Sequence, residues 1–473
     1  MGPGETEADA VVVGSALAGL VAAAILTRHG KRVVVLEHAD TVGGRGGAVE
    51  RDGFWIDFGH RDGHDVGDCQ IAWQHGAEAA REAGVELVLR PLSPPLRVHR
   101  FPDGGVLDGS WGPGGFLAAA REFFECPEDG LVELGAVVGR LAAADAAEVD
   151  AAIPETLGTW LPAHVRHPGV RRALLLMATV IFHPHPEEAS LGRLMRFFQT
   201  PQAGPFIPDD DEVGGMQGLM EPWARAIRAR GGEIALGWKP VEIVVDGGRV
   251  RGAVAVDRTN LVREVRAPVV ISTYPVWEHF DLIDERLFPA DFVAAARTLR
   301  GHRADLVGWQ AGLQRLPVIR ATGKPEHHAG WNRLLKGSGR EYRGGYQITS
   351  LTSRRAAPPG KHLLMLVMAR WFRGGSTAGQ PWTAARAELD EAIAYLRHFH
   401  ADLDECRAWS AYQYVSAPQT TSWAWAPVRR HGLEVPGIAG LLLAGSTIES
   451  PAAIVDVGAW AGLAAARRAL ALL

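Results

Sequence analysis

The chain has 473 residues, enough for two joined domains or one large α/β unit, with 47% hydrophobic and 22% charged residues. This composition excludes an intrinsically disordered protein, and a net charge of −5 argues against nucleic-acid binding. Cys69, Cys126 and Cys406 share no disulfide-framework or metal-ligand spacing. We therefore expect no metal site, and a reducing cytoplasm is the expected compartment.

The N-terminal region predicts a strand, a helix and a second strand. Ala10–Val13 is a continuous apolar run that ends at a glycine, as buried parallel strands do. Helical periodicity follows over 17–28, and residues 32–37 form another apolar run. The length matches a parallel crossover unit. Because Gly14 and Gly19 interrupt the apolar residues, we do not expect a membrane span, and the polar, acidic first residues do not resemble a secretory signal.

The rest of the chain alternates between predicted strands and helices. We expect helices over 116–124, 131–147, 218–230, 383–399 and 457–472, and strands over 233–236, 241–245, 250–256, 267–273, 306–313, 345–351, 362–369 and 440–445. Asp246-Gly247-Gly248 predicts a hairpin turn. The pattern indicates an α/β protein. We expect a Rossmann-like nucleotide-binding domain from segments 1–100, 213–280 and 430–473, and an inserted α+β substrate domain from 101–212 and 281–429.

A glycine-rich turn lies between the first strand and the first helix. In Gly14-Ser15-Ala16-Leu17-Ala18-Gly19, the first glycine permits the tight turn, a small residue at 16 allows close approach of a pyrophosphate, and the last glycine lets the helix pack near the sheet. The start of the helix offers amide N–H groups and a positive dipole to phosphates. Such a turn also occurs without a nucleotide, so it needs support from other residues.

Two further features supply that support. Glu37 ends the second strand 18 residues after Gly19, where a carboxylate can accept hydrogen bonds from a ribose. Gly43-Gly44-Arg45-Gly46-Gly47 then provides a flexible loop with one arginine for phosphate charge. Residues 52–59 predict a strand that ends at Gly59. Together these features favour a bound dinucleotide.

These motifs resemble the phytoene-desaturase and amine-oxidase superfamily of FAD-dependent oxidoreductases, and are most similar to its phytoene-desaturase branch. Two distant segments add to the resemblance. Residues 214–219 with 231–252 are similar to the family's adenine-side segment, and 440–446 with 455–465 to its C-terminal flavin segment. The three segments occur in the family's order and cover less than half of the chain.

The resemblance implies a non-covalent FAD site, because the C-terminal segment has no cysteine to tether a flavin. It implies a pyrophosphate contact for the first glycine turn and the Gly43–Gly47 loop, a ribose contact for Glu37 with His38 beside it, and an adenine contact for the backbone of Val241. It also implies contacts with the ribityl chain and pyrimidine for the C-terminal segment, and places Gly59 and His60 near the isoalloxazine. The implied cofactor residues are Gly14, Ala16, Leu17, Ala18, Gly19, Glu37, His38, Gly43, Gly44, Arg45, Gly46, Gly47, Gly59, His60, Val241, Gly445, Ser446, Val455 and Asp456.

The sequence says less about catalysis and substrate binding than about the cofactor. A flavin performs the hydride chemistry itself, so His60 is a candidate catalytic group by position alone, and the alternative is a loop histidine bound to backbone. Four aromatic residues before the C-terminal segment are candidates for a substrate pocket or for ordinary core between the domains. They are Tyr412, Tyr414, Trp423 and Trp425.

We expect an enzyme that desaturates or dehydrogenates a largely apolar, isoprenoid-like small molecule. A flavin amine oxidase is the first alternative, although residues 303–313, where the resemblance implies a lysine, contain none. A redox-neutral isomerase or a saturase is the second alternative, and a non-enzymatic lipid escort protein is the least favoured. Oxygen, a quinone or an electron carrier would each serve as electron acceptor. The sequence leaves peripheral membrane contact and the oligomeric state open.

Overall fold

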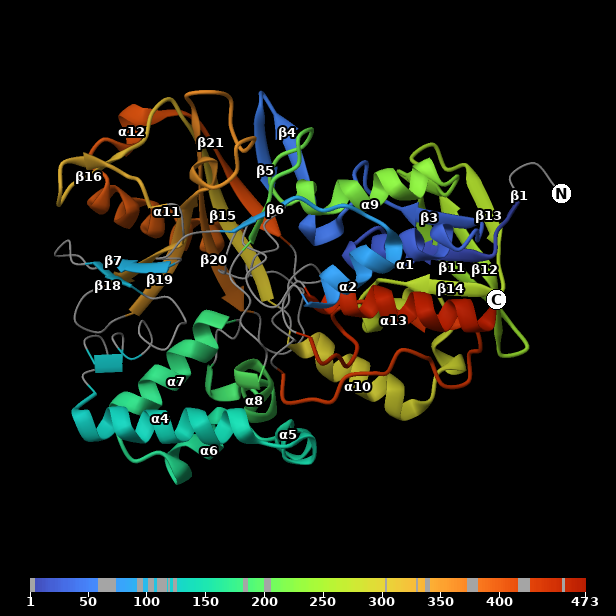
Figure 1. Ribbon diagram of the computed structural model, residues 1–473, viewed down its shortest axis with the longest axis horizontal. Helices are drawn as coiled ribbons and strands as arrows, with labels where there is room; N and C mark the ends of the chain where they lie inside the picture. The colour runs from blue at the N-terminus through green and yellow to red at the C-terminus, as the bar shows by residue number, and fades with distance from the viewer. Residues whose placement is uncertain are drawn as a thin grey trace.

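The computed structural model describes residues 5–57, 74–91, 97–100, 106–108, 117, 120–121, 126–181, 186–199, 206–302, 304–328, 331–336, 341–371, 382–415, 426–452 and 456–473. Two sheet-containing regions lie at opposite ends of the molecule, and a group of helices lies below the second sheet (Figure 1). The N- and C-termini both lie at the end that holds the first region.

A five-stranded parallel sheet forms the centre of the first region, as predicted. Its strands, in spatial order, are β10 (Glu233–Leu236), β3 (Val33–Glu37), β2 (Ala10–Val13), β14 (Val269–Ser272) and β22 (Leu441–Leu443). All neighbouring pairs run parallel. The three central strands and β22 are fully buried, which explains their continuous apolar sequences.

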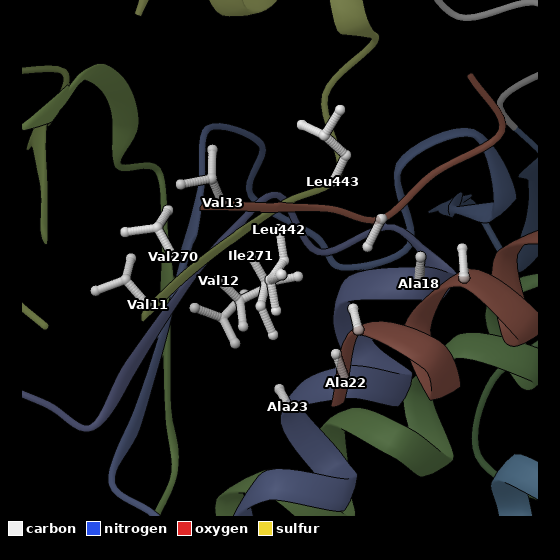
Figure 2. Close-up of a cluster of buried hydrophobic side chains, with 14 of the residues drawn as sticks. Val11, Val12, Val13, Ala18, Ala22, Ala23, Val270, Ile271, Leu442 and Leu443 are labelled. Carbon is white, nitrogen blue, oxygen red and sulfur yellow. The ribbon is translucent and has the colours of Figure 1, made fainter. Parts of the chain in front are cut away.

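Helices cover one face of this sheet. They are α1 (Leu17–Arg28), α9 (Gln217–Ala229) and α13 (Asp456–Leu472), and α2 (Gln74–Ala83) packs on α1 and α13. Val12, Ile271 and Leu442 lie in register and face α1 (Figure 2). Helices α1 and α13 approach closely, because a Cβ atom at Gly462 would lie 2.3 Å from the carbonyl oxygen of Ala18. Small residues at this crossing therefore join the two ends of the chain.

A second, four-stranded sheet packs into the same hydrophobic core. Its strands are β1 (Glu5–Glu7), β13 (Val262–Arg266), β12 (Arg249–Val256) and β11 (Lys239–Asp246). The predicted hairpin turn joins β11 to β12, and both of its glycines have positive φ angles. Val250, Ala253 and Val265 are buried against the parallel sheet. The parallel sheet is therefore covered on both faces.

A mixed seven-stranded sheet forms the second region. Its order is β21 (Arg407–Val415), β15 (Ala304–Leu313), β20 (His362–Trp371), β19 (Glu341–Ile348), β18 (Trp331–Lys336), β7 (Arg97–Arg100) and β8 (Val106–Asp108). Helix α11 (Trp382–Phe399) packs on one face through Leu389 and Leu396. The antiparallel hairpin β4 (Ala48–Arg51) and β5 (Phe54–Asp57) contacts this sheet through Phe54 and Trp409.

A separate cluster of helices has its own apolar core. It contains α4 (Glu128–Ala143), α5 (Ala146–Ala152), α6 (Leu157–His164), α7 (Pro168–Ile181) and α8 (Leu191–Gln199). The predicted helix 131–147 was wrong at its end. Asp145 accepts a hydrogen bond from the Glu148 amide and starts a new helix with a capping box. The predicted helix 116–124 lies mostly outside the described residues.

The domain boundaries stay a prediction, and two elements bear on them. Helix α10 (Ala290–Gly301) packs Phe292 and Leu299 into the core of the first region, although it lies within the predicted segment 281–429. Strand β7 joins the seven-stranded sheet, although it lies within 1–100. Among the described residues, no helix has the length and apolarity needed to cross a membrane.

A buried histidine predicts how stability depends on pH. His279 is fully buried in the 3₁₀ segment Val276–Asp281, and burial lowers its pKa to about 4, although hydrogen bonds from its ring to the backbone of Pro275 and Val276 act in the opposite direction. In the unfolded chain it takes up a proton near pH 6.5. The free energy of unfolding should therefore fall as pH decreases from about 6.5 to about 4, by up to about 3 kcal/mol.

Urea denaturation of the wild type and of His279→Phe at pH 7 and pH 4.5 would measure this effect. We expect the variant to lose less stability than the wild type over this interval. His327→Phe makes the same change at an exposed position and controls for the substitution itself. An equal loss of stability in the wild type and His279→Phe would contradict the prediction.

Candidate functional site

Adjacent parallel strands end together at one edge of the five-stranded sheet. Gly14 follows β2, Thr273 follows β14 and Gly445 follows shortly after β22. A Cβ atom at Gly14 would lie 2.3 Å from Thr273 Oγ1, and one at Gly445 would lie 3.1 Å from the Thr273 carbonyl oxygen. The carboxyl edge of such a sheet is where α/β proteins bind ligands. The first and last predicted cofactor segments therefore meet there.

The glycine-rich turn brings α1 close above this edge. Gly14 has a φ of +90°, and a Cβ atom at Gly19 would lie 2.2 Å from the Gly14 carbonyl oxygen. Ala16 precedes α1, makes no side-chain cap, and no acidic residue occupies the first turn. Leu17 and Ala18 begin the helix. An uncapped helix start carries positive charge, so this arrangement leaves room for the predicted phosphate contact, which stays a prediction.

The second glycine loop lies directly against the first. Ala16 and Gly43 form an isolated bridge, and the Gly43 amide donates to the Ser15 carbonyl oxygen at 2.9 Å. A Cβ atom at Gly44 would lie 3.2 Å from the methyl group of Ala16, so a side chain at position 44 would crowd the approach of the two loops. Gly46 and Gly47 complete the turn through hydrogen bonds to the carbonyl oxygens of Gly43 and Gly44. The loop is therefore held over the same edge.

Arg45 connects this loop to the C-terminal segment. Its Nη2 donates to Ser446 Oγ at 2.9 Å, across 401 residues of sequence. Arg430 donates to the Ser446 carbonyl oxygen at 3.1 Å, so a second guanidinium lies beside the same residue. Arg45 therefore places one cation in the loop that contacts Ala16 at the uncapped helix start, which suits a pyrophosphate. The arrangement fits the cofactor position that the sequence predicted.

Glu37 is more enclosed than a ribose acceptor needs to be. Its side chain is 3% exposed, and Oε2 accepts hydrogen bonds from the Ser15 amide at 2.8 Å and the Ser15 hydroxyl at 2.6 Å. Oε1 accepts from the Ala39 amide at 2.8 Å and lies 3.0 Å from His38 Nδ1. These contacts occupy about the four lone pairs of a carboxylate. Glu37 therefore holds the glycine turn in place. A ribose hydroxyl that bonds Glu37 would replace the exposed His38 as its hydrogen-bond partner.

Electrostatics support this description of Glu37. Burial raises its pKa, but hydrogen bonds from His38, Ser15 and Ala39 outweigh burial, and the pKa is lowered overall. The pKa of His38 is raised, chiefly by its hydrogen bond to Glu37. The carboxylate is therefore ionised at neutral pH.

Val241 lies at a bulge in the β11–β12 hairpin. Pro240 pairs with Ala255 and Glu242 with Val254, so Val241 has no direct partner in the ladder, and its side chain is 38% exposed. Just before β11, the Trp238 amide donates to the Glu37 carbonyl oxygen at 2.8 Å. The predicted adenine-side segment therefore lies next to the predicted ribose residue, and a bulge leaves backbone groups available.

Asp456 joins two helices. Its carboxylate accepts hydrogen bonds from the amides of Gly76, at 2.7 Å, and His75, at 3.1 Å, and so caps the start of α2 from the start of α13. Burial raises the pKa of Asp456 to about 6, although the two amide bonds lower it. The predicted contact of Asp456 with a flavin stays a prediction. Its described role is to hold α2 against α13.

No sequence pattern indicated the charged cluster beside Asp456. A cavity of about 480 Å³ is lined by residues that include Gln74, Arg196, Glu449, Asp456 and Trp460. Glu449 Oε1 accepts from Arg193 Nη1 at 2.6 Å and also bonds Arg196. Burial raises the pKa of Glu449, but Arg193 outweighs it and the pKa falls to about 2. Only the tertiary structure brings these side chains from α8 to the C-terminal segment.

Two of the predicted pocket residues lie away from the first region. Tyr412 and Tyr414 pair with Trp309 and Val307, which belong to the core under α11. Tyr412 bonds Asp390 of α11 at 2.5 Å, and the two tyrosine rings are 40% and 48% exposed. The alternation of side chains along a strand therefore places both tyrosines on the α11 face. Core between the domains, the alternative for these residues, is therefore wrong for the two tyrosines, and their place in a substrate pocket stays a prediction.

Several predicted residues lie outside the described residues. These are Gly59, His60, Trp423, Trp425 and Val455. Their predicted roles stay predictions. Among the described residues, no group of three or more histidine, cysteine, aspartate or glutamate side chains is placed to hold a metal ion.

Comparison with known proteins agrees with this geometry. Residues 17–470 match the family described as flavin containing amine oxidoreductase. The chain is 38% identical over 113 residues to a phytoene dehydrogenase of Streptomyces griseus, which is 24% of this chain and 22% of that protein. It is 41% identical over 101 residues to prolycopene isomerase 2 of an Oncidium hybrid cultivar, 20% of this chain and 16% of that protein. The chain thus spans about a fifth of these two relatives.

Solved structures share the whole fold. An oxidoreductase from Methanosarcina mazei has a TM-score of 0.69 over 97% of this chain and 99% of its own, at 17% identity. That likeness shows the fold, while the family match extends over nearly the entire sequence. The glycine turns and the uncapped start of α1 fit a flavin dinucleotide. The chain therefore belongs to the flavin-containing amine oxidoreductase family.

Proposed function

We propose that this protein binds FAD non-covalently and dehydrogenates a largely apolar organic substrate. The observation that carries the proposal is the meeting of three chain segments at one sheet edge: the Gly14 turn, the Gly43 loop and the segment that contains Ser446. A dinucleotide, unlike a single phosphate, needs such an extended site. The matched phytoene dehydrogenase and prolycopene isomerase support an isoprenoid-like substrate.

The chain's own residues would bind and orient the cofactor. Leu17, Ala18 and Gly19 present the start of α1 to the pyrophosphate, and Arg45 balances phosphate charge beside Ser446. The bulge at Val241 offers backbone groups to an adenine. When bound, FAD would accept the hydride of the substrate at N5. His60 is proposed to lie near that ring.

Amine oxidation is the second candidate, because the matched family is described by that activity. The family resemblance implies that an amine oxidase would carry a lysine on the strand that corresponds to β15. Residues 303–313 of this chain contain no lysine. Redox-neutral isomerisation is the third candidate, since the matched Oncidium protein is an isomerase. In each case the proposed cofactor site is the same, and the substrate distinguishes them.

The absorption spectrum of the purified protein, reconstituted with FAD if necessary, tests the cofactor. We expect the visible absorption bands of an oxidised flavin, on the order of one FAD per chain, and release of the intact flavin on denaturation. Protein that stays colourless after incubation with FAD would refute the proposal. Flavin that remains attached to the denatured chain would refute non-covalent binding.

Anaerobic reduction distinguishes the reactions. An isoprenoid substrate, tested as phytoene and as its hydroxylated analogues, should bleach the flavin band, whereas benzylamine should leave it unchanged. Bleaching by the amine alone would favour amine oxidation. Conversion of a polyene to its isomer without net reduction of the flavin would favour isomerisation. Repeating the assay with oxygen, a quinone or an electron carrier would identify the acceptor that reoxidises the flavin.

A further inference from the structure

The two faces of the seven-stranded sheet differ in polarity. Trp309, Tyr346 and Leu366 point into the apolar core under α11. Because side chains alternate along a strand, their neighbours Gln310 and Gln347 lie on the other face, with Met365 in register between them. Gln310 and Gln347 are only 2% and 1% exposed. Buried glutamines on a sheet face need hydrogen-bond partners.

Gln310 belongs to a chain of side-chain amides. Its Nε2 donates to Gln413 Oε1 at 2.9 Å, and Gln413 Nε2 donates to the Asp57 carbonyl oxygen at 2.6 Å. Gly308 lies beside this chain, since a Cβ atom there would lie 3.4 Å from Gln413 Oε1, in ordinary van der Waals contact. The chain connects β15 through β21 to the end of β5.

The orientation of both amides follows from the Asp57 carbonyl group. A carbonyl oxygen only accepts, so Gln413 must turn its NH₂ group toward Asp57 and its oxygen toward Gln310. Gln310 must then turn its own NH₂ group toward Gln413. The amide atom of Gln310 that does not face Gln413 is therefore its oxygen. Reversing either amide would place two acceptors, or two donors, in contact.

That oxygen lacks a donor. Gln310 Oε1 is buried and has no hydrogen-bond partner among the described residues. Leaving a buried acceptor without a partner costs free energy, and glutamine is seldom retained in such a place without a purpose. Asp57 precedes Gly59 and His60 by two and three residues, and that segment is proposed to approach the flavin. The amide chain from Gln310 therefore ends at Asp57, next in sequence to the segment that is proposed to approach the flavin.

We propose that Gln310 is a specificity-determining residue whose Oε1 accepts a hydrogen bond from an O–H or N–H group of the substrate. This inference rests on the proposed function and narrows its substrate class. The substrate is then an otherwise apolar molecule with one hydroxyl or amine donor, rather than a pure hydrocarbon. The Asp57 carbonyl group fixes the orientation of both amides, so Gln310 presents Oε1. This oxygen selects a substrate group that donates a hydrogen bond over one that accepts.

Paired probes test the donor directly. Geranylgeraniol and its methyl ether share one carbon skeleton, and only the alcohol can donate; geranylgeranylamine and its N,N-dimethyl derivative form a second pair. Binding to the FAD-loaded protein is measured from the perturbation of the flavin spectrum above pH 11, where both amines are neutral, and near pH 7 for the alcohol pair. We expect the wild type to bind a donor at least about tenfold more tightly than its methylated partner in one pair.

Variants assign that preference to Gln310. Gln310→Leu should bind the two members of the pair equally. Met365→Leu changes the apolar surface next to Gln310 in register and should keep the wild-type preference. The ratio of two affinities in one protein is insensitive to a general loss of stability.

The outcomes separate the two proposals. Protein that takes up no FAD refutes the proposed function at the first step, before any probe is added. FAD-loaded protein that binds neither pair, or binds donor and methylated partner equally, overturns the role of Gln310 and leaves the cofactor proposal intact. A preference that survives in Gln310→Leu also overturns it, because another group must then recognise the donor.

Discussion

Gly19→Ala should lower FAD affinity about ten- to a hundredfold. The added Cβ atom would lie 2.2 Å from the Gly14 carbonyl oxygen and 3.0 Å from Thr273 Cγ2, so α1 would have to move away from the strand ends. Overpacking of this kind costs about 1–3 kcal/mol, and here it displaces the helix start that is proposed to bind phosphate. Titration of the apoprotein with FAD, followed by flavin fluorescence, measures the loss.

A matched glycine separates this effect from the substitution itself. Gly135 lies inside α4, and a Cβ atom there would meet no atom within 4 Å. Gly135→Ala should keep wild-type FAD affinity and gain up to about 1 kcal/mol of stability, since alanine favours a helix. Circular dichroism of both variants checks that they are folded. A folded Gly19→Ala protein with unchanged affinity would contradict the assigned role of the turn.

Glu37→Gln should weaken both the fold and FAD binding. The variant's NH₂ group cannot accept a hydrogen bond, so the two Ser15 donors or the Ala39 and His38 donors lose their acceptor. We expect the free energy of unfolding to fall by about 2–4 kcal/mol at pH 7 and FAD binding to weaken by about 1–3 kcal/mol. Urea denaturation without FAD and FAD titration measure the two effects separately.

The pH dependence sharpens this prediction. Because the pKa of Glu37 is lowered from 4.5, its contribution to stability is present above pH 4.5 and is lost as pH falls through the lowered pKa. The stability difference between the wild type and Glu37→Gln should therefore narrow in acid. Glu264→Gln, which alters an exposed carboxylate bonded to Arg266 at 3.1 Å, should change stability by less than about 0.5 kcal/mol. A constant difference at all pH values would show that ionised Glu37 is not its source.

The sequence by itself determined the dinucleotide-binding elements. The strands Ala10–Val13 and Val33–Glu37, the helix between them and the hairpin at Gly247 were all predicted from local pattern. Apolar runs, a 3.6-residue period and glycine turns are encoded over a few neighbouring residues, so tertiary contacts only reinforce them. The glycine turn was readable for the same reason, since positive φ and close approach require glycine at fixed positions.

Only the tertiary structure decided which side chains meet. The face occupied by Tyr412 depends on the register between β15 and β21, and a shift of one residue would have turned it the other way. Arg45 and Ser446, Arg193 and Glu449, and Gln413 and Asp57 come from distant segments, and no local pattern predicts those contacts. Buried polar groups satisfy one another through space rather than along the chain, so the proposed donor preference is visible only in the folded protein.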